Sequence, residues 1–268
     1  MDYDGTLSAN GTVDHDLIKL IQSARSKGIK VVIASGRPLD RLPVDLIRAA
    51  DAVCCEGGGV ISVGNTVQVI ADEKWFRFLD ALERSNIPHA RGKVAVLVDA
   101  PHLEPTLSLA REVGAPFRTE LYKDYFFVLP ETVSKLAAVQ RLLQLLDVDG
   151  NALVVGDELN DLELMKWARW SAAVKNAREE VKAVATVVLD RDDGEGVKDC
   201  IAAIIESQTG TNGLAGKAAN PRRANEAFTP HLSGNGIPRG FLKSFLRNAN
   251  RLQNKTQRRP KKHLGFRG

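Results

Sequence analysis

The chain has 268 residues, of which 44% are apolar and 26% charged, and its formal net charge is +4. This length allows one large domain or two smaller ones with real cores, and the composition is ordinary for a soluble globular protein. Because no apolar run reaches the roughly 18 residues of a membrane span and no signal-peptide pattern opens the chain, we expect a cytoplasmic protein without a transmembrane segment.

Stretches with helical periodicity alternate with short apolar runs through residues 1–71. Apolar residues at helical spacing predict helices, and short apolar runs bounded by turn residues predict buried strands. The predicted elements are a helix at 17–28, a strand at 30–34, a helix at 39–50, a strand at 52–55 and a hairpin at 60–70. Strands and helices that alternate in this way predict a parallel α/β sheet.

From residue 72 the same rhythm continues in smaller units. The predicted elements are a helix at 73–84, a strand at 94–99, a helix at 104–113 and strands at 117–121 and 125–129, with Pro130 as a boundary. We therefore predict a small inserted α/β cap at residues 72–130. It divides a core of the Rossmann-like type, a doubly wound parallel sheet, into residues 1–71 and 131–207.

The second part of the core repeats the alternation of strands and helices. Its predicted elements include a helix at 133–146, strands at 152–155, 172–174 and 186–189, and a final helix at 197–206. An odd number of cysteines, two of them neighbours, gives no disulfide framework, so we expect Cys54, Cys55 and Cys200 to be buried reduced thiols.

A basic tail is predicted for residues 208–268. It carries 13 Lys and Arg residues against one acid, Glu226, a net of +12 that leaves −8 for residues 1–207. Its composition, rich in Gly, Asn, Pro, Lys and Arg, is typical of disorder. Apolar and basic residues at 241–252 fit two faces of one helix, which is either a solvated tail or a contact for RNA or an anionic membrane surface.

Two carboxylates, Asp2 and Asp4, stand two residues apart ahead of Gly5. Residues two apart in an extended segment share a face, so both acids point the same way if residues 1–4 end a strand. Such a pair suits a hard divalent cation, or a nucleophile with an acid/base partner. Taken alone, the pair fits a solvated acidic terminus better.

Three further segments that carry candidate functional residues follow predicted strands or open a predicted helix. They are Ser35, Lys135 and the run G-D-E-L-N-D at 156–161. Because ligands bind beyond the carboxyl ends of the strands in a doubly wound sheet, we expect these segments and the N-terminal acids to face one crevice. Each has a simpler explanation alone: a helix N-cap, a solvated first-turn lysine, and acids favoured at a helix start.

Taken in order, these segments resemble the motifs of the haloacid dehalogenase-like (HAD) phosphohydrolases. D-Y-D-G-T-L at 2–7 resembles motif one, A-S-G-R at 34–37 motif two, Lys135 in V-S-K-L motif three, and G-D-E-L-N-D-L-E-L-M at 156–165 motif four. The insert between motifs two and three is similar to that of the Cof-like subgroup, which includes archaeal-type phosphoglycolate phosphatases and sucrose-phosphate phosphatases. The resemblance covers residues 1–207 and none of the tail.

The resemblance implies a Mg²⁺-dependent phosphatase that works through an aspartyl phosphate. It makes Asp2 the nucleophile and Asp4 the general acid and base, and a carboxylate can indeed attack phosphorus and split one displacement into two. The implied Mg²⁺ ligands are the Asp2 side chain, the Asp4 backbone carbonyl and Asp157, with Asp161 close by or bound through water. The implied phosphate ligands are Ser35, the Gly36 amide, Lys135 and Asn160.

The implied substrate is a small phosphorylated metabolite, either a sugar phosphate or phosphoglycolate. In the cap, Lys123, Tyr125 and Phe126 either meet its leaving group or are ordinary surface and core residues. Two other functions stay open. One is a catalytically impaired binding protein whose tail binds RNA or another polyanion, and the other is a phosphomutase or phosphotransferase that passes the phosphoryl group to a sugar.

The binding-protein alternative comes from a departure at the N-terminus. In this family a hydrophobic strand precedes the nucleophile at the centre of the sheet, where strands are buried on both faces. Here only Met1 precedes Asp2. A missing central strand predicts unpaired backbone groups on its neighbours and an Asp2 that sits on a frayed terminus.

Overall fold

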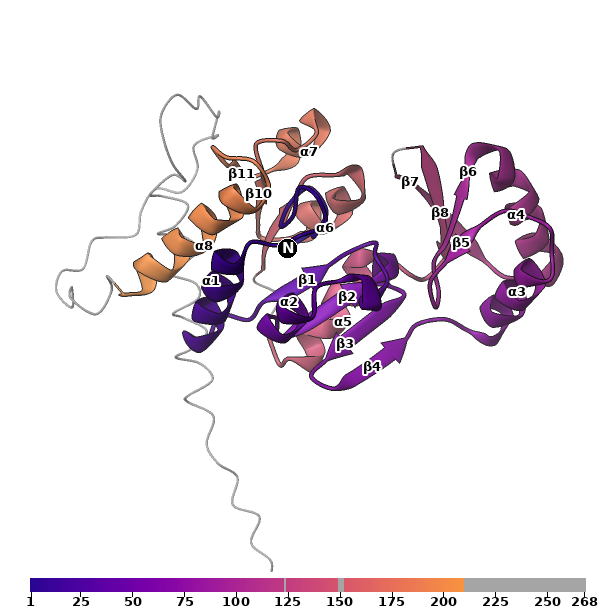
Figure 1. The fold of residues 1–268 in the computed structure, drawn as a ribbon, viewed down its shortest axis with the longest axis horizontal. Helices are drawn as coiled ribbons and strands as arrows, with labels where there is room; N and C mark the ends of the chain where they lie inside the picture. The colour runs from indigo at the N-terminus through magenta and orange to yellow at the C-terminus, as the bar shows by residue number, and fades with distance from the viewer. Residues whose placement is uncertain (123, 149–151, 210–268) are drawn as a thin grey trace, which may run out of the picture.

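The computed structural model describes residues 1–122, 124–148 and 152–209, which form a large α/β body with a smaller lobe beside it (Figure 1). The basic tail predicted from residue 208, with its amphipathic stretch, therefore lies outside the described residues from 210 onward, and so does Lys123. Among the described residues, no helix is long and apolar enough to cross a membrane.

Two groups of strands make up the sheet of the body. On one side β1 (Val32–Ala34) pairs in parallel with β2 (Ala52–Cys55), and the hairpin of β3 (Val60–Val63) and β4 (Thr66–Val69) extends it antiparallel. On the other side β9 (Leu153–Gly156), β10 (Trp170–Ala173) and β11 (Val187–Val188) pair in parallel. All residues of β2 and β10 are buried, as expected for parallel strands covered on both faces.

The N-terminal segment joins these two groups of strands. The Met1 ammonium donates to the Val32 carbonyl at 2.9 Å, and the Ala34 N–H donates to the Met1 carbonyl at 2.9 Å. On the opposite side the Asp2 N–H donates to the Val155 carbonyl, also at 2.9 Å. The expectation of a frayed Asp2 is therefore wrong, because two residues are enough to bridge β1 and β9 at this point.

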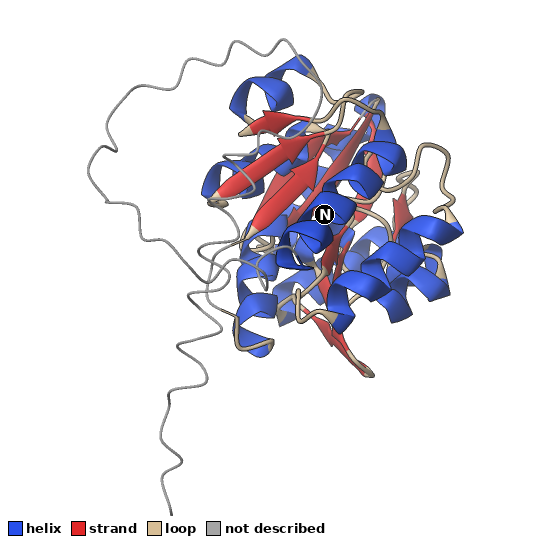
Figure 2. Cartoon of the chain, turned by 90° about the vertical axis from the view of Figure 1, so that its left-hand side faces the viewer, coloured by secondary structure: helices blue, strands red, loops and turns tan. Residues whose placement is uncertain are grey.

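Helices cover both faces of this sheet (Figure 2). On one side α1 contacts α2 and α8, and on the other α5 packs on β1 to β3 and contacts α6, which in turn contacts α7. Their bounds are α1 (His15–Ser26), α2 (Val44–Ala49), α5 (Lys135–Leu145), α6 (Leu162–Trp167), α7 (Glu179–Val184) and α8 (Asp193–Thr209). The 3₁₀ turns are η1 (Leu39–Arg41), η2 (Glu56–Gly58) and η3 (Leu159–Asp161).

The single helix predicted at 39–50 is wrong. The chain forms η1, then a break, then α2 from Val44. The break coincides with Pro43, which is the N-cap of α2 and lacks an amide hydrogen that could continue a helix through it.

The smaller lobe is the cap, built on an antiparallel sheet with the strand order β5-β6-β8-β7. Its elements are α3 (Glu73–Glu83), β5 (Ala90–Arg91), β6 (Val96–Asp99), α4 (Ala100–Val113), β7 (Phe117–Tyr122) and β8 (Tyr125–Pro130). The register pairs Val96 with Val128 and Val98 with Phe126, so these residues share one face of the sheet. Val96, Val98 and Val128 belong to the same apolar cluster as the buried residues of α3 and α4.

The other face of the cap sheet is turned toward the body. A Cβ atom built on Gly36 would lie 3.4 Å from the Phe127 ring, and one built on Gly57 would lie 3.0 Å from Leu129. Of the two described candidates on β8, alternation puts Tyr125 on the same face as Phe127 and Phe126 on the helix side, where it is a core residue, the alternative that the sequence left open.

Candidate active site

The candidate site is organised by Asp2, which lies at the junction between β1 and β9. Its backbone is held on both sides by the hydrogen bonds of the N-terminal segment, and its side chain is only 7% exposed. The chain then turns sharply at Gly5, which adopts a φ of +79° that residues with a side chain rarely take. This turn brings the start of the chain against the loop that follows β9.

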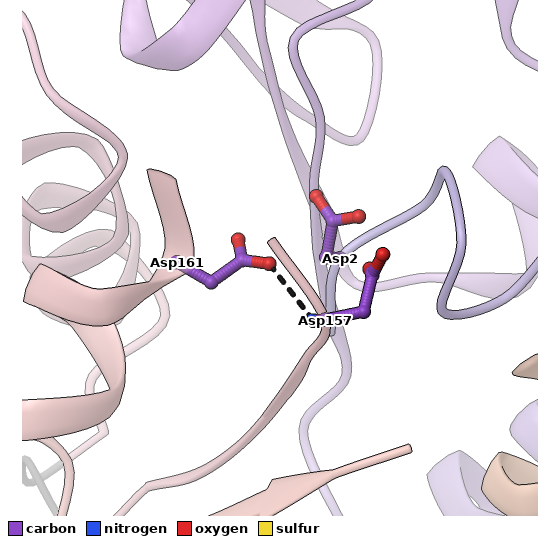
Figure 3. Close-up of side chains that lie close together, drawn as sticks. All are labelled: Asp2, Asp157 and Asp161. Carbon is purple, nitrogen blue, oxygen red and sulfur yellow. Dashed lines mark hydrogen bonds between the residues drawn. The ribbon is translucent and has the colours of Figure 1, made fainter. Parts of the chain in front are cut away.

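Three carboxylates meet at this point, those of Asp2, Asp157 and Asp161 (Figure 3). Each offers an oxygen atom, and these atoms lie within 4.8 Å of one another. Asp157 directly follows β9, and Asp161 ends η3. Asp161 Oδ2 accepts the N–H groups of Asp157 and Glu158, at 3.2 Å each, so it also fixes the loop that carries Asp157. We call these three residues the acidic cluster.

Lys135 supplies the positive charge inside the acidic cluster. It is the first residue of α5, whose N-cap Ser134 accepts the N–H of Ala137, and it is 3% exposed. Its Nζ donates to Asp2 Oδ1 at 2.6 Å and to Asp161 Oδ1 at 2.8 Å. A third, longer hydrogen bond of 3.2 Å goes to Oδ1 of Asn160. Lys135, which the family resemblance makes a phosphate ligand, is thus the centre of a buried ionic network in this structure.

The acidic cluster carries more negative charge than its lysine can balance. Three carboxylates meet here and only the Lys135 ammonium group contacts them directly, which is a sum of −2 on full ionisation; the buried Met1 ammonium interacts with Asp2 and Asp161 without contacting them. Burial, and then repulsion from Asp161, raises the pKa of Asp2 to about 8, and burial raises the pKa of Asp157 to about 7. Burial alone would lower the pKa of Lys135, but the two carboxylates at its Nζ outweigh this and raise the pKa.

The donor set fits a hard divalent cation. Both oxygens of Asp161 already accept hydrogen bonds, whereas Lys135 binds only Oδ1 of Asp2, and Thr6 binds only Oδ1 of Asp157, at 2.6 Å. Within the described residues, Oδ2 of Asp2 and Oδ2 of Asp157 have no hydrogen-bond partner. Carboxylate oxygens are the ligands that Mg²⁺ prefers, and a divalent ion would cancel the excess charge.

Ser35 and Gly36 lie in the loop directly after β1, next to Asp2. Asp2 forms a bridge with Ala34, the last residue of β1, so this loop starts beside Asp2. Ser35 is 1% exposed, and its hydroxyl oxygen accepts the N–H of Arg37 at 3.0 Å. We call residues 35–37 the phosphate loop, a name that reflects the predicted role of Ser35 and Gly36.

Asp4 does not join the acidic cluster through its side chain. Its carboxylate is held by Arg37 instead, with Nε at 2.8 Å from Oδ2 and Nη2 at 2.7 Å from Oδ1. The same guanidinium lies over the Tyr3 ring, 5.1 Å from its centroid. From the sequence, Arg37 is expected to be structural or weakly functional, although its place two residues after Ser35 was a signal for proximity to the site.

Two supporting residues of the N-terminal turn were not among the sequence candidates. Thr6 fixes the Asp157 carboxylate, as described above, and the Asn176 side chain donates to the Gly5 carbonyl at 2.8 Å. A Cβ atom on Gly5 would lie only 2.1 Å from Asp157 Oδ2, so the close approach of the two loops requires glycine. The two residues are 171 positions apart, and no spacing rule connects Asn176 with Gly5.

Comparisons with known proteins point to one family. Residues 1–99 and 117–201 match the family model of haloacid dehalogenase-like hydrolases. A phosphoglycolate phosphatase from Sulfurisphaera tokodaii is 27% identical over 215 residues, which are 76% of this chain and 92% of the relative. A phosphoglycolate phosphatase from Methanopyrus kandleri is 28% identical over 222 residues, covering 76% of this chain and 95% of the relative.

Solved structures share the fold. A Thermoplasma acidophilum protein superposes with a TM-score of 0.62 at 21% identity, covering 76% of this chain and 96% of its own. A sugar phosphatase of HAD subclass IIB gives a TM-score of 0.60 at 16% identity, covering 75% and 96%. At these identities the likeness concerns the fold alone.

Proposed function

Because the chain belongs to the haloacid dehalogenase-like hydrolases and is a phosphatase of the Cof-like type, we propose that it hydrolyses the phosphate monoester of a small metabolite with Mg²⁺ bound at the acidic cluster. The observation that carries this proposal is the cluster of three carboxylates at the junction of β1 and β9, in which the buried Asp2 and Asp161 both contact Lys135. Burying ionised groups is costly, so apolar residues would stabilise the fold here at least as well. The cluster is therefore better explained by function than by stability.

In the proposed reaction Asp2 is the nucleophile. A carboxylate oxygen of Asp2 attacks phosphorus and the bond to the leaving oxygen breaks, which gives an aspartyl phosphate and an alkoxide. Water then attacks the phosphorus, which releases inorganic phosphate and restores the Asp2 carboxylate. Mg²⁺ bound at Asp2 and Asp157 supplies the positive charge that offsets repulsion between the attacking carboxylate and the phosphate dianion.

Asp4 is the proposed acid and base of these two steps. Protonated Asp4 gives its proton to the leaving oxygen, and the resulting carboxylate takes one from the attacking water. Arg37 holds that carboxylate with two short hydrogen bonds, which fix its orientation beside Asp2. We assign to Arg37 the task of orienting Asp4, a task that the sequence did not suggest.

The remaining proposed roles concern the phosphate group. Ser35, the Gly36 amide, Lys135 and Asn160 would bind its oxygens as negative charge develops on them. Support comes from position: Lys135 contacts Asp2 and Asn160, and the phosphate loop starts next to Asp2. The Asp4 backbone carbonyl and Asp161 complete the proposed metal site, Asp161 through water because both its oxygens are engaged.

Phosphoglycolate is the substrate that we propose first. Several relatives that are 25–28% identical to this chain, each matched over at least 92% of its own length, are phosphoglycolate phosphatases. A sugar phosphate is the second candidate, as expected from the resemblance to the Cof-like subgroup. Both substrates would reach the cap face that carries Phe127, which lies against the phosphate loop at Gly36.

The test is phosphate release by the full 268-residue chain from 2-phosphoglycolate, glucose 6-phosphate and acetyl phosphate, each with Mg²⁺ and with EDTA. We expect turnover with Mg²⁺ that disappears in EDTA and in Asp2→Asn. The matched control is Asp16→Asn, an exposed aspartate on α1, which should leave turnover unchanged. Turnover that survives Asp2→Asn would reject the proposed nucleophile, and transfer to added glucose in place of water would identify a phosphotransferase.

A further inference from the structure

Glu56 is a buried carboxylate that the proposed chemistry does not use. It directly follows β2, is 1% exposed, and has a φ of +53°, a region that strains any residue with a side chain. Three glycines follow it in the sequence, yet a glutamate occupies the strained position. Backbone strain and burial of an acid both cost stability, so the contacts of the Glu56 side chain must explain why a glutamate stands here.

The contacts of the Glu56 carboxylate lie in the cap. Oε1 accepts the N–H of Lys93 at 3.0 Å, and Oε2 accepts the N–H groups of Val94 and Ala95 at 2.7 and 2.9 Å. Three successive backbone amides that converge on one carboxylate form an anion-binding concavity, here filled by a side chain of the body. We call residues 92–95, the turn between β5 and β6, the docking turn.

Glycines on both sides make this contact possible. A Cβ atom on Gly92 of the docking turn would lie 2.4 Å from the Glu56 carboxyl carbon. A Cβ atom on Gly59 of the body would lie 2.7 Å from Cβ of Val94. The Trp75 indole of α3 donates to the Val94 carbonyl at 2.9 Å, so the docking turn is also fixed within the cap.

The backbone around Glu56 is bonded to the phosphate loop. The Glu56 N–H donates to the Arg37 carbonyl at 3.1 Å, and the Gly57 N–H donates to the Ser35 carbonyl at 3.2 Å. The same two residues of the phosphate loop carry the Asp4 clamp and the predicted phosphate hydroxyl. A continuous set of hydrogen bonds therefore leads from the docking turn through Glu56 to the loop beside Asp2.

We propose that Glu56 is a positioning residue that seats the cap on the phosphate loop and serves as a fixed pivot for cap movement. The two covalent connections, near residues 71 and 131, would allow the cap to swing, and the docking turn adds a third point that holds one corner in place. The distance between the Phe127 face and the phosphate loop is then set by Glu56, and with it the fit of the leaving group. This role deepens the proposed phosphatase function and rests on it for its kinetic test alone.

The first test compares Glu56→Gln with the matched control Glu131→Gln, an exposed glutamate just after β8. The amide keeps the shape but replaces one acceptor oxygen with a donor, so at least one amide of the docking turn loses its partner. We expect kcat/KM to fall about tenfold or more, mainly through KM, for the better of 2-phosphoglycolate and glucose 6-phosphate. Acetyl phosphate, whose acetyl group carries neither a free carboxylate nor a sugar ring for the cap to bind, should lose much less. An equal loss for both substrates, or none, would overturn the proposal.

The second test does not depend on activity. In hydrogen exchange of the metal-free chain, Glu56→Gln should speed exchange at the amides of residues 93–95 and of the phosphate loop, while α1 and α8 stay protected. Faster exchange in the docking turn alone would show that Glu56 anchors the cap without coupling it to the loop, and would overturn the proposal. If wild type shows no phosphatase activity, the proposed function fails, and this exchange pattern still decides the role of Glu56.

A second variant covers the case in which Glu56→Gln does not fold. Gly92→Ala pushes a methyl group against the same carboxylate from the cap side and leaves Glu56 in place. We expect the same selective rise in KM and the same exchange pattern. A Gly92→Ala variant with wild-type substrate preference and wild-type exchange at residues 93–95 would contradict the pivot.

Discussion

Replacing Lys135 by methionine should destabilise the protein strongly, because it removes the ammonium group that is hydrogen-bonded to Asp2 and Asp161. The side chain is 3% exposed and makes hydrogen bonds of 2.6 and 2.8 Å to Asp2 and Asp161. Methionine fills a similar volume, so the change is mainly one of charge. Removal of one partner from a buried ion pair leaves an uncompensated charge and costs about 3 to 5 kcal/mol.

In the metal-free protein, the stability lost in Lys135→Met should be larger at high pH than at low pH. Burial and the nearby Asp161 raise the pKa of Asp2 from its ordinary value of 3.8 to about 8, so between these limits the folded state holds a proton that the unfolded chain has lost. Stability therefore falls as pH rises from about 4 to 8, by up to about 1.4 kcal/mol per pH unit for such a group. Lys135 opposes this by lowering the pKa of Asp2, so its removal should matter more at pH 8 than at pH 5.

Urea unfolding at pH 5 and pH 8 in EDTA measures both effects. The matched control is Lys19→Met on α1, whose ion pair with Asp16 is exposed and worth at most about 0.5 kcal/mol. If Lys135→Met costs no more than Lys19→Met, or if its cost shrinks from pH 5 to pH 8, the account of the buried network is wrong.

Three other outcomes follow from the same geometry. Arg37→Gln should lower kcat about 10-fold to 100-fold with little change in KM, because the Asp4 carboxylate loses the side chain that orients it. The control Arg41→Gln, on the exposed turn η1, should leave kcat unchanged, and equal effects of the two variants in steady-state assays would refute the orienting role. Gly5→Ala should lose more stability in urea than the control Gly64→Ala. Both glycines have positive φ, but only Gly5 has a carboxylate oxygen 2.1 Å from the added methyl carbon. Equal losses of stability would show that this contact relaxes. Mg²⁺ should raise the melting temperature more at pH 8 than at pH 5.5, because metal binding competes with protons for the carboxylates of the acidic cluster. A larger rise at pH 5.5 in thermal scans would contradict a carboxylate metal site.

Most of the fold could be predicted from the sequence because apolar runs and helical periodicity coincide with turn residues. The strands at 52–55 and 60–63 and the helix at Lys135 lie where periodicity puts them. The helix predicted at 39–50 was wrong because periodicity was given more weight than Pro43. The two-residue strand β5 was missed because so short a segment has no period to detect.

The site was less predictable than the fold, because side-chain partners depend on contacts between distant segments. The motifs located Asp2, Asp157 and Lys135, but nothing local indicates that Lys135 is buried between two acids. The expected common face of the two N-terminal acids depended on a regular strand, whereas the Asp4 carboxylate is held by Arg37. At the cap, the sequence left open whether Tyr125 and Phe126 face the substrate, and only the register of β8 decides it, since neighbouring residues of a strand point to opposite faces.

Chemical trapping of the proposed covalent intermediate tests the central claim most directly. The full chain is mixed with 2-phosphoglycolate and Mg²⁺, quenched in acid during turnover, reduced with borohydride and digested for mass spectrometry. The account predicts homoserine in place of aspartate at position 2, dependent on substrate and Mg²⁺. Phosphate release that proceeds under the same conditions with Asp2 unmodified, or with homoserine at another aspartate, would contradict it.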